Sequence, residues 1–157
     1  VQLCLVAGEG AEMPLRFGGK SAPLTGEPCD ALVRIVALSE TAEMKFGESV
    51  VPFGPAARIA LLTSEGAETG IEVILNTIRA QSYDPSLFLA LGIDPVTQRI
   101  LVIKSTNHFY AAFAPIAAEI LYCSAGKPYP NDPATNPYRL VRKDIWPRMA
   151  DPFGEES

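Results

Sequence analysis

Proline and glycine are the residues that most limit how this chain can fold. The 157 residues include 14 prolines and 12 glycines, which recur along the sequence. Proline interrupts helices and lacks a backbone N–H, whereas glycine favours tight turns. The chain must therefore be built from short elements joined by frequent turns. Its hydrophobic fraction of 48% still suffices for a buried core, which excludes a disordered chain.

Runs rich in β-branched and aliphatic residues predict strands in the first half of the chain. The clearest are residues 31–38, 57–63 and 71–78, and residues 44–46 predict a short edge strand. A glycine-containing turn at 64–70 separates the second run from the third. This spacing favours an antiparallel pair.

Strand and helix patterns alternate in the second half. Residues 86–92 predict a helix capped by Asp84, and another helix is expected from 106 or 107 to 114. Strands are expected at 99–104 and 119–123. The order from the third strand onward is β-α-β-α-β, which favours parallel pairing. The predicted fold is an α/β domain with a mixed sheet, whose C-terminal portion is parallel.

The same patterns indicate which side chains are buried and how the chain ends. The expected core positions of the second half are Ile74, Leu101, Ile103, Phe113, Ile116 and Leu121. Residues 127–147 are rich in proline and predict an extended C-terminal strap. Its Tyr129, Tyr138 and Trp146 are expected to pack on the body of the domain.

The charge and cysteine content exclude several classes of partner. Thirteen basic and eighteen acidic residues give a net charge of −5, whereas nucleic-acid-binding modules normally present a basic face. Neither nucleic acid nor a membrane is an expected partner, since no apolar run approaches the roughly 18 residues of a membrane span. Three cysteines without a disulfide pattern, and an N-terminus without signal-peptide features, favour a cytoplasmic location.

Polar side chains follow two of the predicted strands. One group comprises Lys104, Ser105, Thr106, Asn107 and His108, and the other comprises Asn76, Thr77 and Arg79. In parallel sheets, ligands gather at the carboxyl ends of strands, where helix N-termini attract anions. The sequence therefore predicts a substrate- or anion-binding corner. The alternative is that Thr106 and Asn107 only cap a helix and Lys104 is solvated.

His108 is the only histidine of the chain. Together with Lys104 it is a candidate catalytic residue, and the alternative is a structural histidine hydrogen-bonded to the backbone. One histidine without an H-x-x-x-H or C-x-x-C motif does not supply the three protein ligands of a catalytic zinc, so no metal ligand is assigned. A Cys–His pair is disfavoured because Cys123 lies in an apolar run.

Four parts of the sequence form a recognisable set. The longest is residues 100–118 (ILVIKSTNHFYAAFAPIAA), and the others are 15–20 (LRFGGK), 81–85 with 91–94 (QSYDP, LGID), and 137–139 with 145–147 (PYR, IWP). Together they resemble the C-terminal domain of the microcystinase C (MlrC) family of zinc metallopeptidases. The resemblance extends over almost the entire chain, in the expected order.

The resemblance implies that the chain, expected to be a single domain over 1–157, belongs to a longer two-domain protein. A preceding domain of the family carries the aspartate and histidine ligands of zinc, whose bound water attacks the scissile amide. The chain itself is then non-catalytic, packs on the metal-bearing domain and helps to wall the substrate cleft. The apolar start at Val1 fits an element that begins upstream.

Two functions from different classes remain open at this point. The first is the C-terminal domain of a zinc hydrolase, inactive by itself. The second is a stand-alone regulatory module that binds a small anionic molecule at the corner around Lys104, without peptidase chemistry. The partners expected are the missing metal-bearing domain and, through exposed apolar surface, a second copy in a homodimer.

Overall fold

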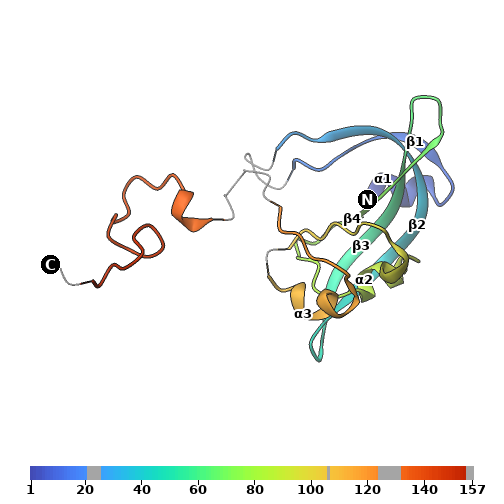
Figure 1. The fold of residues 1–157 in the computed structure, drawn as a ribbon. Coiled ribbons are helices and arrows are strands. Elements are labelled where there is room, and N and C mark those ends of the chain that lie inside the picture. The colour runs from blue at the N-terminus through green and yellow to red at the C-terminus, as the bar shows by residue number, and fades with distance from the viewer. Residues whose placement is uncertain (21–25, 106, 124–131, 155–157) are drawn as a thin grey trace. The chain divides into compact units, whose positions relative to one another are not determined.

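The computed structural model describes residues 1–20, 26–105, 107–123 and 132–154 (Figure 1). Its contacts divide the chain into two compact units. Unit 1 comprises Val1–Arg16 and Asp30–Ile120, and unit 2 comprises Phe17–Cys29 and Leu121–Ser157. Apart from Thr106, which lies outside the described residues, all the candidate site residues belong to unit 1.

A four-stranded antiparallel sheet is the framework of the fold (Figure 1). Its strands follow the order of the chain and are β1 (Glu12–Phe17), β2 (Cys29–Phe46), β3 (Ser49–Leu62) and β4 (Glu68–Asn76). The Ile35 N–H donates to the Ala11 carbonyl at one end of β1, and Arg16 pairs with Asp30 at the other. These contacts make β1 antiparallel to β2.

The strands predicted in the first half are present, and two of them are longer than predicted. The run at 31–38 continues to Phe46, so residues 44–46 are the end of β2 rather than a separate strand. Phe46 pairs with Ser49 across a two-residue turn in which Gly47 has a φ of 59°. The predicted antiparallel pair is confirmed as β3 and β4, with Ile59 opposite Val73.

Gly54 allows the chain after β4 to pass close to β3. Its φ is +70°, and a Cβ at this position would lie 2.6 Å from Thr77 Oγ1 and 2.9 Å from Ile78 Cγ1. The Thr77 N–H and hydroxyl both donate to the Pro55 carbonyl, each over 3.2 Å. A side chain at residue 54 would therefore push this crossing away from the sheet.

The helices are short, as the proline and glycine content requires. They are α1 (Gln2–Ala7), α2 (Ser86–Ala90) and α3 (Tyr110–Phe113). The helix predicted after Asp84 is confirmed as α2, and Asp84 Oδ1 accepts the Ser86 N–H over 2.8 Å. Among the residues that the structure describes, no helix has the length and apolarity to cross a membrane.

Arg58 fastens the C-terminal end of α2 to the sheet. From β3, its guanidinium donates to the carbonyls of Leu91 and Gly92 over 3.2 and 2.9 Å. The same side chain forms a half-buried salt bridge of 2.8 Å with Glu72 on β4. Three segments are thereby joined at the last turn of α2, where unpaired carbonyls favour a cation.

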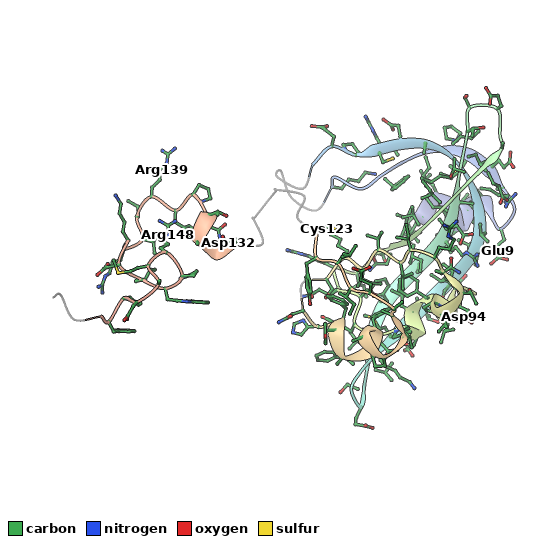
Figure 2. All side chains as sticks on the ribbon, in the orientation of Figure 1. Glu9, Asp94, Cys123, Asp132, Arg139 and Arg148 are labelled. Carbon is green, nitrogen blue, oxygen red and sulfur yellow. The ribbon has the colours of Figure 1, made fainter. Side chains whose placement is uncertain are left out.

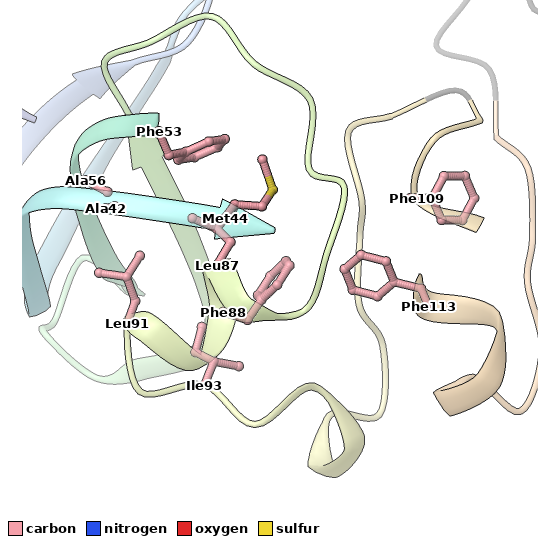
Figure 3. Close-up of a cluster of buried hydrophobic side chains, with 10 residues drawn as sticks. All are labelled: Ala42, Met44, Phe53, Ala56, Leu87, Phe88, Leu91, Ile93, Phe109 and Phe113. Atoms are coloured by element: carbon pink, nitrogen blue, oxygen red, sulfur yellow. The ribbon is translucent and has the colours of Figure 1, made fainter. Parts of the chain in front are cut away.

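One hydrophobic cluster unites the hairpin of β2 and β3 with the helices α2 and α3 (Figure 3). Its buried members are Ala42, Met44, Phe53, Ala56, Leu87, Phe88, Leu91, Ile93, Phe109 and Phe113. Phe88 and Phe113 meet edge to face, with ring centroids 6.0 Å apart. Their rings connect the two helices, which the chain separates by some twenty residues.

The predicted parallel portion is wrong for the described chain. Residues 99–104 and 119–123 form no strand, and all of them are described. The apolar run at 99–104 suggests burial on both faces, but Ile100 and Val102 are 83% and 85% exposed. A parallel strand requires a hydrogen-bonded neighbour on the sheet, and β4 supplies none here.

The predicted core of the second half is confirmed in part. Phe113 is buried, whereas Ile74, Leu101 and Ile103 are half-buried and pack on the cluster. Ile116 and Leu121 are exposed, because α3 continues only as a short 3₁₀ turn, Ala114–Ile116, rather than leading into a strand. Pro115 lies in this turn and interrupts the α-helical hydrogen bonds.

Unit 2 contains the proline-rich end of the chain. Asp132 caps a 3₁₀ turn at Pro133–Thr135, and Arg148 donates to the Asn136 carbonyl and lies 5.9 Å from the Tyr138 ring centroid (Figure 2). Tyr138 and Trp146 are exposed, and Tyr129 lies outside the described residues. The predicted strap is not confirmed.

Leu91 and Leu89 offer a matched test of the cluster. Leu91 is 1% exposed and Leu89 is 57% exposed, although both belong to the same turn of chain. We expect Leu91→Ala to lower the free energy of unfolding by about 2–5 kcal/mol, because it leaves a cavity. Leu89→Ala should cost less than about 1 kcal/mol. Urea unfolding measures both, and equal losses would contradict this packing.

Candidate functional site

The described residues of the run 104–108 lie beside the segment that precedes α2. Ser105 is half-buried, and its hydroxyl donates to Gln81 Oε1 over 2.8 Å. Lys104 and Asn107, on either side of it, are exposed. Thr106, the remaining polar candidate of this run, lies outside the described residues. The structure therefore brings four of the five predicted residues to one corner, which contacts the loop before α2.

His108 is exposed and touches two aromatic rings at this corner. Its ring centroid lies 5.8 Å from that of Phe46 and 5.7 Å from that of Tyr83, both in edge-on geometry. Phe46 and Tyr83 also contact each other, with centroids 4.6 Å apart. We call Phe46, Tyr83 and His108 the aromatic trio. Its two partner rings hold the imidazole in place without engaging its nitrogens.

The backbone positions the partner rings of His108. Phe46 is the last residue of β2, directly before the hairpin turn. Beside it, the Tyr83 N–H donates to Met44 Sδ over 3.1 Å, and the Lys45 N–H donates to Ser86 Oγ over 3.1 Å. The end of β2 is thereby held against the loop before α2. Sequence patterns give no signal for this contact, because the two segments lie far apart in the chain.

The side chains of His108 and Asn107 do not have the structural roles that the sequence offered as alternatives. Neither nitrogen of His108 hydrogen-bonds a described residue, so the expected backbone partner is not found. The N-terminus of α3 has no side-chain cap; the Asn107 carbonyl accepts the Tyr110 N–H over 3.1 Å. His108 and Asn107 thus keep polar side-chain atoms open to solvent.

The other predicted group, near the end of β4, has a different role. The Asn76 amide donates to the Phe53 carbonyl over 3.4 Å, and Thr77 binds Pro55 as described above. These two side chains support the crossing at Gly54. Arg79 is exposed and forms no hydrogen bond or ion pair with a described residue.

Lys104 is the cation of the corner. It is exposed and forms no ion pair with a described residue, and the same holds for Arg79 and Arg99 elsewhere in unit 1. Ion pairs of unit 1 lie on the sheet, where Arg34 pairs with Glu68 and Arg58 pairs with Glu72. Lys104 thus offers positive charge at the corner, although the chain as a whole has a net charge of −5. Such a charge attracts carboxylates or other anions.

A zinc site does not fit the described residues. They contain no group of three or more His, Cys, Asp and Glu side chains placed to hold a metal ion. The one histidine has aromatic neighbours rather than carboxylates or thiols. A catalytic zinc takes three protein ligands, so no step through a metal is assigned to this part of the chain.

Two surface features of unit 2 lack the character of a binding site. The shallow hollow at residues 137–141 is lined by consecutive residues alone. Near it, hydrogen bonds from Arg142 hold the pKa of the Asp144 carboxyl below its usual range, and the pair is fully exposed. Neither feature gathers side chains from separate parts of the fold, as binding sites do.

Comparison with known proteins identifies the class of this chain. The sequence profile of the MlrC C-terminus family matches residues 1–140. The chain therefore belongs to the MlrC C-terminal domain family, as the motifs around His108 indicate. It is also 29% identical over 147 residues to Microcystinase C of a Sphingomonas species. The match covers 94% of this chain but only 27% of that protein, so the chain spans about a quarter of the relative's length.

The aromatic trio can be tested by NMR, because His108 gives the only histidine ring signals. We expect Phe46→Leu to shift these signals, since the ring current of Phe46 acts on the imidazole at 5.8 Å. Val50→Ala, on the other strand of the same hairpin, serves as the control and should leave them in place. Unchanged signals in Phe46→Leu would contradict the placement of His108.

Proposed function

We propose that the chain is the non-catalytic C-terminal domain of an MlrC-like zinc metallopeptidase or amide hydrolase. It packs on the metal-bearing N-terminal domain and helps to wall the substrate cleft. The observation that carries this proposal is the family match over residues 1–140. The short share of Microcystinase C that the chain covers supports a further domain in the whole protein.

The histidine content supports a division of labour between the two domains. The whole chain has one histidine, and the described residues do not fit a three-ligand zinc site. We therefore assign the zinc ligands of the whole protein to its N-terminal domain. The present chain contributes a rigid wall, built on the cluster around Met44 and α2.

The corner at His108 is the part of the chain that we place at the cleft. His108 and Asn107 offer polar atoms to solvent, and Lys104 and Arg79 offer unpaired positive charge. Ser105 and Thr106 complete the candidate substrate-binding set. Donors and cations fixed by a protein stabilise a substrate carboxylate or the oxyanion that develops during attack on an amide.

A stand-alone module that binds a small anion is the second candidate function. The observation that favours it is the exposed Lys104 of the corner, which forms no ion pair with a described residue. The two candidates differ in what the gene encodes. A preceding domain with clustered aspartate and histidine ligands supports the hydrolase, and its absence supports the module.

The cellular setting follows from cysteine use. Cys4, Cys29 and Cys123 form no disulfide among the described residues, and disulfides are rare in the cytoplasm. We therefore propose a cytoplasmic location. The homodimer expected from exposed apolar surface has no support in the structure or the comparisons, and the N-terminal domain is the partner that we retain.

Zinc content tests the division of labour. We expect the full-length protein to keep near-stoichiometric zinc after dialysis, because the N-terminal domain supplies the ligands. The chain of 157 residues alone should keep almost none and hydrolyse no peptide. Elemental analysis measures both proteins in parallel. Stoichiometric zinc in the isolated chain would contradict the assignment.

His108 tests the role of the corner in the full-length protein. We expect His108→Ala to lower kcat/KM at least about tenfold, because a polar contact to the transition state is lost. His108→Phe is the matched control for packing, since it retains contacts with Phe46 and Tyr83 and removes the ring nitrogens. It should be equally impaired, with unchanged thermal stability. Full activity of His108→Phe would make His108 a packing residue.

A further inference from the structure

Residues 99–104 have the side-chain pattern of a β-strand without being one. Leu101 and Ile103 pack on the hydrophobic cluster, whereas Ile100 and Val102 are 83% and 85% exposed. Alternation with a period of two is the pattern of extended backbone that has one face on a core. The outer face, however, carries the apolar β-branched residues Ile100 and Val102, whereas a solvent-exposed strand face normally carries polar residues.

The backbone of this segment is almost entirely unpaired. Within residues 99–104, no N–H donates a hydrogen bond to a described residue. One carbonyl accepts, that of Ile103, from the Ser105 N–H over 3.0 Å. Between the bend at Arg99 and the tight turn that this bond closes around Lys104, unpaired N–H and C=O groups form a template for another strand. Main-chain hydrogen bonding of this kind is how β-strand addition gains affinity.

The segment is held in position before any partner arrives. Its inward side chains are anchored in the cluster that also holds α2 and α3. Just beyond its end, Ser105 is bound to Gln81 over 2.8 Å. A partner strand would therefore find a preorganised edge and would not have to order this part of the chain, which reduces the entropic cost of association.

Charge determines what kind of strand can pair there. Arg99 and Lys104 stand at the two ends of the segment, exposed and without an ion pair to a described residue. Lys104 also belongs to the candidate corner at His108, so Arg99 is the charge that is left for a partner strand. A strand with an acidic residue near Arg99 is complementary to this end of the segment.

We infer that residues 99–104, hereafter the docking segment, accept a β-strand from the N-terminal domain of the same protein. That strand has apolar residues at alternating positions, which cover Ile100 and Val102, and an acidic residue near one end, which pairs with Arg99. This inference rests on the proposed function and names the surface through which the two domains join. The relative of this chain extends well beyond the matched 27% of its length, which leaves ample chain to supply the strand.

Amide hydrogen exchange of the full-length protein tests the inference. Paired amides of the docking segment should exchange at least about 100-fold more slowly than unstructured amides. Val102→Lys should abolish most of this protection, because it places a charge on the covered face. Val96→Lys is the matched control, since Val96 is 66% exposed, belongs to the neighbouring 3₁₀ turn and lies outside the docking segment. It should leave the protection intact.

The outcomes separate the inference from the proposed function. Association of the two domains is measured separately, by co-elution after proteolytic cleavage of the linker between them. If the domains still co-elute but the docking-segment amides are unprotected, strand addition is overturned and the proposed function stands. Domains that separate would overturn the proposed function. Protection that persists in Val102→Lys would overturn the inference. Protection that appears only at high protein concentration would also overturn it, because it would indicate pairing with a second copy of the chain.

Discussion

The packing of Met44 is the interaction on which the rest of unit 1 depends. Met44 is almost fully buried near the end of β2, and its sulfur accepts the Tyr83 N–H. Together with the bond from the Lys45 N–H to Ser86 Oγ, this side chain holds the end of the long hairpin against the loop before α2, where Phe46 contacts Tyr83. The same contact supports both ring neighbours of His108.

The same core also supports the docking segment. Leu101 and Ile103 pack on the cluster that contains Met44, and Ser105 follows directly with its bond to Gln81. The candidate corner and the docking segment are therefore consecutive parts of one stretch of chain on one support. Joining of a second domain at residues 99–104 would bring that domain next to His108, which is where a cleft between the domains should form.

The sequence predicted local structure well and long-range structure poorly. The antiparallel pair at 57–63 and 71–78 and the helix after Asp84 are local patterns, and both are confirmed. Asp84 accepts the Ser86 N–H, although the N-cap position of this helix is Pro85. The prediction of parallel strands is wrong because an apolar run such as 99–104 indicates only that the segment is covered. It does not identify the part of the protein that covers it. His108 was recognised as a candidate, but its ring partners come from distant segments that no spacing rule connects to it.

A crystal structure of the full-length protein is the most direct test of this account. The account predicts a strand of the N-terminal domain hydrogen-bonded along residues 99–104, with an acidic side chain near Arg99. It also predicts that the imidazole of His108 faces the zinc-containing cleft from the opposite wall. A structure in which residues 99–104 remain open to solvent, or His108 lies away from the cleft, would contradict it.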